Sequence, residues 1–244
     1  MQRNMKSEFS YKNLNDLFKI ISRYRTSGIK NFYLKRENCI VMRHDIDISL
    51  KKAVEFAKIE SKYDINATYF IMTTSPMYNI HFSENRDRIK YLLDMGFEVG
   101  LHFDPSIYCF GDLEKYLSLE VADLSSVANI SLESYAVHNP SLLVKKFHSL
   151  KYTDAWDETL FEDSFATDSR MEFPDNIINF LEMSKINPVQ LGLHPEHYSE
   201  EGYGYDKIFS DVILDFAFDI DNTFSVNSNY AKVVGSILAR VKIS

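Results

Sequence analysis

Five short segments of this chain each lead from an apolar run into a side chain that can bind a metal or move a proton. The first, Cys39-Ile40-Val41-Met42, leads to Asp45 and Asp47, and the others lead to His102, His138, Asp168 and His194. Their β-branched and aromatic residues predict strands. In the first part of the chain, helical patterns alternate with these strands. That alternation predicts a parallel α/β sheet, either doubly wound or closed as a barrel.

The placement of the polar groups favours the barrel. In a (β/α) barrel the carboxyl ends of all strands meet on one face, where catalytic side chains gather. All five segments follow that rule. The chain shows no internal repeat and no domain boundary, so we expect a single domain over residues 1–244, with residues 1–38 as an N-terminal helical extension.

Composition limits the function classes. Apolar residues make up 45% of the 244 residues, which is ample for a sizeable core, and the net charge is −8 with scattered basic residues. This charge argues against nucleic acid or an anionic membrane as the main partner. Cys39 and Cys109 make no disulfide framework, the N-terminus is polar, and no run is long enough to span a bilayer. We therefore expect a cytoplasmic protein with reduced thiols.

Local patterns place the other elements. Apolar residues at helical spacing predict a first helix from Leu14 to Tyr24, which Gly28 ends. Ser49 and Ser83 are predicted N-caps of the next two helices. Longer helical patterns cover 113–127 and 233–241. Further strands are expected at 67–71, 97–101, 134–137, 151–156, 165–168 and 189–193.

The segment Arg43-His44-Asp45-Ile46-Asp47 carries the densest chemistry. Side chains alternate along a strand, so Asp45 and Asp47 should project on one side and His44 on the other, packed under a helix. Two close carboxylates repel each other unless a cation or a shared proton relieves them. A divalent metal would take one as a ligand and leave the other as a base. The alternative is that the pair caps the following helix.

The histidines at the strand ends are candidate ligands or acids. His102 is placed either as a nitrogen ligand to zinc or as a packed core histidine. His138 precedes Asn139-Pro140, a helix start that Asn139 would cap without using the imidazole. His194 could be a general acid. The remaining histidines, His81, His148 and His197, are expected in solvent. Trp156 is expected in the core, although an aromatic face beside a polar site can stack on a sugar.

Taken together, these segments resemble the polysaccharide deacetylase superfamily (NodB homology, carbohydrate esterase 4). More narrowly, they are similar to bacterial surface-polysaccharide-cluster members with an Arg-His-Asp-x-Asp motif. The resemblance runs from Val41 to Tyr198, with motifs at 43–47, 96–102, 135–140, 165–169 and 191–195. It implies a distorted (β/α)7-type barrel and hydrolytic removal of acyl groups from amino sugars.

The resemblance also implies residue roles. Asp45 would be the base, Asp168 its support and His194 the acid. Asp47 and His102 would bind the metal. Asp168 would act through Arg43 or Arg170. Residues predicted to contact substrate are Arg43, Trp156 and Asn139.

The sequence departs from the family pattern at two positions. The family's second metal histidine falls at Ser106, and the arginine of its third motif is replaced by His138. One hypothesis resolves both, namely that His138 supplies the missing ligand beside Asp47 and His102. The predicted metal is zinc, with cobalt or nickel as alternatives.

The predicted function is metal-dependent removal of an N-acyl group from an amino sugar or glycan intermediate in bacterial surface polysaccharide metabolism. Two alternatives stay open: hydrolysis of another C–N bond, such as that of a cyclic amide, and a non-catalytic carbohydrate-binding barrel. Ser106 keeps the second alternative open. The sequence is silent on the sugar, the acyl group and the oligomeric state.

Overall fold

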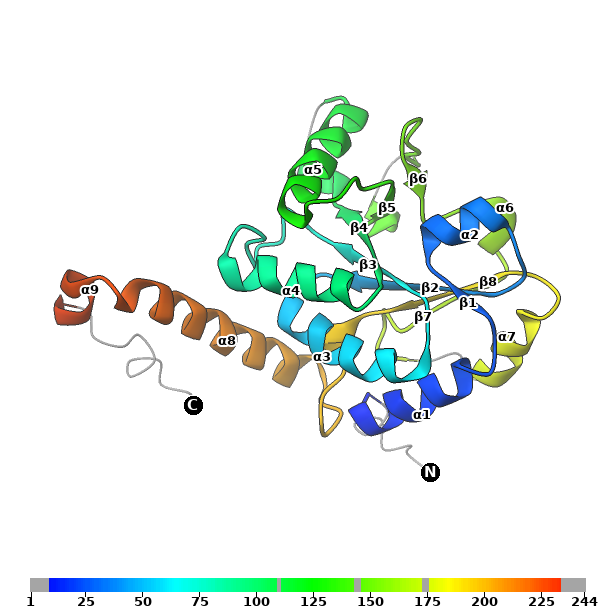
Figure 1. Ribbon diagram of the computed structural model, residues 1–244, viewed down its shortest axis with the longest axis horizontal. Coiled ribbons are helices and arrows are strands. Elements are labelled where there is room, and N and C mark those ends of the chain that lie inside the picture. Colours follow the sequence, from blue (N-terminus) through cyan, green and yellow to red (C-terminus); the bar gives the residue numbers. More distant parts are fainter. Residues whose placement is uncertain (1–8, 109–110, 143–145, 173–175, 234–244) are drawn as a thin grey trace.

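The chain folds around a curled, parallel sheet (Figure 1). The computed structural model describes residues 9–108, 111–142, 146–172 and 176–233. Within them, seven strands follow the order β6-β5-β4-β3-β2-β8-β7, and β1 pairs with β2 outside that path. The strands are β1 (Thr26–Ser27), β2 (Ile40–Ile46), β3 (Thr68–Ile71), β4 (Glu98–Phe103), β5 (Ser134–Val137), β6 (Thr153–Asp154), β7 (Phe165–Thr167) and β8 (Val189–Leu193). The predicted distorted (β/α)7-type barrel is confirmed.

Most of the helices lie around the curled sheet, and the last two extend away from it, as Figure 1 shows. The helices are α1 (Tyr11–Ile21), α2 (Ile29–Lys35), α3 (Leu50–Glu60), α4 (Ser83–Asp94), α5 (Leu113–Ala128), α6 (Glu158–Phe161), α7 (Ile177–Met183), α8 (Tyr205–Ser225) and α9 (Ser228–Val233). Short 3₁₀ turns are η2 (Ser61–Tyr63), η3 (Pro105–Ile107), η4 (Pro140–Leu142) and η5 (Pro195–His197). None of the helices among the described residues is both long and apolar enough to cross a membrane.

Several sequence-based boundaries are corrected. β2 extends to Ile46, because β3 and β8 pair with its backbone on both sides, so Asp45 lies within the strand. Gly28 does not end the first helix; α1 stops at Ile21, and Gly28 is the N-cap of α2. Ser83 is the first residue of α4 and not its cap, whereas Ser49 caps α3 as predicted.

The helical structure of the C-terminal part of the described chain was not predicted from the sequence. The helix predicted over 233–241 lies almost entirely outside the described residues, whereas the 21-residue α8 before it was not predicted. Helix α8 extends away from the body of the molecule in Figure 1. Only Ile208 and Val212 of this helix are buried, which explains why its mixed apolar and acidic pattern gave no clear signal.

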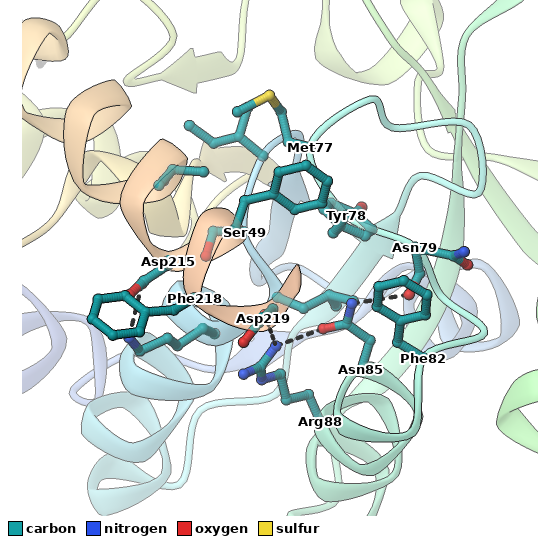
Figure 2. Close-up of a pocket in the computed structure, with 15 residues that line it drawn as sticks. Ser49, Met77, Tyr78, Asn79, Phe82, Asn85, Arg88, Asp215, Phe218 and Asp219 are labelled. Carbon is teal, nitrogen blue, oxygen red and sulfur yellow. Dashed lines mark hydrogen bonds and ion pairs between the residues drawn. The ribbon is translucent and has the colours of Figure 1, made fainter. Parts of the chain in front are cut away.

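Two ion pairs connect the middle of α8 to α3 and α4 (Figure 2). Lys51 contacts Asp215 at 2.8 Å, and Arg88 lies 3.9 Å from Asp219. They flank a pocket of about 230 Å³. Lys51, Asp215 and Asp219 are exposed and Arg88 is partly exposed, so each pair contributes little to stability, typically below about 1 kcal/mol.

A buried polar network lies under α3, on the face of β2 opposite Asp45. The His44 Nε2 atom lies 2.9 Å from Glu60 Oε1, and the Tyr69 hydroxyl donates to Glu60 Oε2 at 2.6 Å. All three side chains are fully buried. The prediction that His44 packs under a helix is therefore confirmed, and Glu60 is the partner that makes its burial tolerable.

Replacing Glu60 by alanine is expected to lower the free energy of unfolding by about 3–5 kcal/mol, because it leaves two buried polar groups without their partner. Urea denaturation followed by circular dichroism measures this. The matched control is Glu55→Ala on the same helix, where a half-buried carboxylate accepts from Tyr11, and where the expected loss is below about 1 kcal/mol. Equal losses in the two variants would contradict the structural role of Glu60.

Candidate metal and acid–base site

The carboxyl ends of the strands enclose a cavity of about 620 Å³. Eight of the nine predicted site residues line it: Arg43, Asp45, Asp47, His102, His138, Asn139, Trp156 and His194. The ninth, Asp168, is fully buried and contacts His194 directly. Parallel strands bring residues from distant parts of the sequence to one edge, which is why separate motifs converge.

Asp47, His102 and His138 form a compact triad of possible metal ligands. Asp47 Oδ1 lies 3.1 Å from His102 Nε2 and 3.2 Å from His138 Nδ1, and the two nitrogens lie 3.1 Å apart. Ligand atoms around a tetrahedral zinc ion are about 3.3 Å apart, so this nearly equilateral triangle needs little adjustment to hold one. The Asp47 Oδ1 atom is buried, and the two ring nitrogens are the contacts that it makes here. The residues present therefore fit a metal ion.

Neighbouring groups orient both imidazoles. The His102 Nδ1 atom lies 3.2 Å from the Ala136 carbonyl oxygen. An N–H there leaves the Nε2 lone pair free for a metal, the usual arrangement of a ligating histidine. The Asn139 side chain lies 2.7 Å from His138 Nε2, and Asn139 adopts a left-handed backbone with φ of 44°. Asn139 directly precedes the 3₁₀ turn that starts at Pro140, the place predicted for a helix start, and its side-chain amide contacts His138.

Two other segments support Asp47 through its backbone. The Asp47 N–H donates to Glu196 Oε1 at 3.2 Å, and the Ser75 hydroxyl donates to the Asp47 carbonyl at 2.8 Å. Burial opposes the charged form of Asp47, but its contacts with His102 and His138 outweigh burial and hold its pKa well below the ordinary value. Burial, together with the nearby Asp47 charge, raises the pKa of Glu196 to about 8. No sequence pattern indicated a role for Glu196.

Asp45 is held by Arg43. The guanidinium donates from Nε to Oδ1 at 3.0 Å and from Nη2 to Oδ2 at 2.5 Å, a bidentate contact. Burial opposes ionisation of Asp45, but the charge of Arg43 outweighs it and lowers the carboxyl pKa. Arg43 was predicted as a substrate contact or as a link to Asp168. The structure pairs it with Asp45, because residues 43 and 45 share one side of β2.

Asp168 and His194 form a carboxylate–imidazole pair beside the triad and the Arg43–Asp45 pair. The His194 Nδ1 atom lies 2.6 Å from Asp168 Oδ1, and the His194 backbone N–H donates to both carboxylate oxygens at 3.0 and 3.2 Å. Burial disfavours the imidazolium, but the Asp168 charge and hydrogen bond dominate and raise the pKa of His194 to about 10. Asp168 therefore contacts the predicted acid directly, with no arginine between them.

His197 was expected in solvent, and that prediction is wrong. Its side chain is only 3% exposed, whereas His81 and His148 are more than half exposed. Pro195 starts a 3₁₀ turn, and the His197 N–H donates to the His194 carbonyl at 3.0 Å. Residues three apart eclipse each other in such a turn, so His197 lies beside His194. The Pro195 position was the signal that could have revealed this.

Two predicted positions lie at the margins of the site. Trp156 is half-buried and meets Phe165 edge to face at 5.1 Å, and both rings line the cavity. Ser106 donates to Asp104 at 2.6 Å in an exposed turn and does not belong to the triad. His138 therefore occupies the place beside His102 that the sequence hypothesis assigned to it.

Comparison with solved structures gives matches of low identity. A mutant of a CE4 family pseudoenzyme with restored enzymatic activity is 17% identical over 73% of this chain and 64% of its own length, with a TM-score of 0.47. The wild-type pseudoenzyme, from Bacillus anthracis, is 20% identical over 71% and 61%, with a TM-score of 0.41. A polysaccharide deacetylase from Bacillus cereus is 15% identical over 68% and 91%, with a TM-score of 0.42.

The chain spans less than two thirds of the length of the pseudoenzyme structures that it matches. A scan against protein-family models finds no match, and neither does a search of curated proteins.

Proposed function

We propose that the chain is a metal-dependent hydrolase that removes an N-acyl group, such as acetyl, from an amino sugar or glycan intermediate. One observation carries this proposal. The Asp47–His102–His138 triad, the Arg43–Asp45 pair and the Asp168–His194 pair come together at one cavity. Together they would supply a ligand set, a base and an acid, the groups that metal-dependent amide hydrolysis uses.

Asp45 is the proposed general base. It is held ionised by Arg43 and lines the cavity together with the triad. Because its pKa is lowered, Asp45 accepts a proton well only from water whose own pKa is reduced. Bound by the triad, a divalent ion would supply that Lewis-acid chemistry, acting on water and on a carbonyl group.

His194 is the proposed general acid. Hydrolysis of an amide expels an amine, which needs a proton to leave. With its pKa raised to about 10, His194 carries a proton at neutral pH and can supply it. The buried Asp168 carboxylate fixes the ring through Nδ1, so the proton to be given lies on Nε2.

The cavity suits a sugar-sized substrate. Its volume of about 620 Å³ lies within the usual range for small-molecule sites. Trp156, Phe165 and Phe147 line it beside the polar groups, and aromatic faces can stack on a sugar ring. The Arg-His-Asp-x-Asp motif supports the narrower proposal of a role in bacterial surface polysaccharide metabolism.

The decisive experiment is a hydrolysis assay on protein loaded with zinc, cobalt or nickel. Free acetate and free amine are measured for a panel of N-acetylated monosaccharides, oligosaccharides and nucleotide sugars, with cyclic amides as the alternative class. We expect release from at least one amino sugar, loss of activity on chelation and recovery when metal is returned. Fully loaded protein that hydrolyses only cyclic amides, or nothing, would refute the proposal.

A further inference from the structure

We propose that His197 and Tyr205 are positioning residues for His194, and that they make the first turn of α8 part of the acid–base apparatus. The kinetic part of this inference rests on the proposed function, because it gives His194 the role of the acid. The structural part stands on contacts around Asp168 alone.

Two imidazoles share one carboxylate. Asp168 Oδ1 faces His194 Nδ1 at 2.6 Å, and Asp168 Oδ2 faces His197 Nδ1 at 3.4 Å. The two rings stack with centroids 4.9 Å apart and planes 27° apart. The Asp168 carboxylate is therefore enclosed by two ring nitrogens and by the backbone N–H of His194, and it is fully buried.

Tyr205 fixes the rotation of the second ring. Its hydroxyl lies 2.9 Å from His197 Nε2 and 3.1 Å from the Ser169 carbonyl oxygen, which holds it in place. Phe9 packs edge-on against the same imidazole, at 6.0 Å and 86°. A flipped ring would lose the Tyr205 contact, so the hydroxyl keeps Nδ1 directed at Asp168. Because Tyr205 is the first residue of α8, the seating of that helix determines this contact.

The shared carboxylate affects the acidity of His194. The charges that face His194 come from three elements: Asp168 after β7, Asp45 on β2 and Glu196 in η5. Tyr198 and Tyr205 face Asp168 as well. An Asp168 carboxylate facing His194 alone would stabilise the imidazolium most strongly. The His197 imidazole, with Nδ1 at 3.4 Å from Oδ2, competes for part of that charge, so His194 releases its proton more readily.

The test is a histidine NMR titration, which needs no catalysis. The His194 signal is assigned with His194→Gln, and its pKa is measured in wild type, His197→Phe, His197→Asn and Tyr205→Phe. We expect the pKa of His194 to rise by roughly 0.5 to 1 in His197→Phe. It should return close to the wild-type value in His197→Asn, whose amide N–H can replace Nδ1–H. Tyr205→Phe should shift it in the same direction by less.

Tyr203→Phe is the matched control, since Tyr203 lies two residues before α8 and is outside the network. In an active enzyme, the alkaline limb of the pH profile of kcat should move to higher pH in the variants whose His194 pKa rises. KM should change little.

An unchanged pKa of His194 in folded His197→Phe overturns the proposal even if the enzyme hydrolyses amino sugars. If that variant does not fold, Tyr205→Phe decides in the same way. Conversely, a shifted pKa in a protein without hydrolase activity supports the network while the proposed function fails.

Discussion

Replacing Asp45 by asparagine is expected to lower kcat by roughly 10²- to 10⁴-fold and to leave metal content unchanged. The magnitude is that of a lost general base. Metal content should persist because Asp45 is paired with Arg43 and does not belong to the triad. The asparagine keeps the shape of the side chain and one oxygen for Arg43, so the change removes mainly the ability to accept a proton.

Steady-state kinetics and elemental analysis on the same preparation measure both quantities. The matched control is Asp104→Asn, an equally small change at a carboxylate that accepts hydrogen bonds from Ser106. That variant should keep kcat within about twofold, since its change lies outside the residues that line the cavity. An Asp45→Asn enzyme as fast as the wild type would remove Asp45 from the role of base.

The second large effect concerns the metal. Asp47→Ala and His138→Ala are each expected to weaken metal binding by more than about 100-fold, whereas Ser106→Ala should bind like the wild type. Loss of a residue that merely orients a ligand costs roughly 10- to 100-fold, so loss of a ligand itself should cost more. Calorimetric titration with zinc measures the affinities directly and does not depend on activity.

The comparison of His138→Ala with Ser106→Ala is the informative one. The two residues follow neighbouring strands, β4 and β5, and only His138 lies in the triad. If Ser106→Ala lost metal and His138→Ala did not, Ser106 and not His138 would be the ligand, and the triad would be misassigned. Circular dichroism of each variant checks that the fold is retained.

Arg43 is the residue that supplies a guanidinium to Asp45 in this chain. In the family that the motifs resemble, the third motif carries an arginine where this chain has His138. In this chain a guanidinium reaches Asp45 from Arg43, two residues earlier on the same side of β2, through a bidentate contact. The site therefore has the His138 imidazole beside His102 and a guanidinium on Asp45, the proposed base. Both contacts lie where strand ends converge on one cavity.

What followed from the sequence alone is what depends on local periodicity. Alternation along β2 predicted that Asp45 and Asp47 would share a side and that His44 would lie opposite, and both acids line the cavity while His44 is buried beneath α3. The apolar runs predicted most strands, two of them with their exact bounds, at 134–137 and 189–193. A strand's side chains alternate whatever its neighbours are, so one segment is enough to predict them.

Only the tertiary structure decided which of these groups meet. The register that pairs His102 with Ala136 places His138 beside His102, and no pattern within either segment contains that register. The 3₁₀ turn after Pro195 and the seating of α8 bring His197 and Tyr205 onto Asp168. Glu60 and Glu196 are buried because of contacts made far along the chain. Burial and partner choice depend on how separate segments pack, which local sequence does not encode.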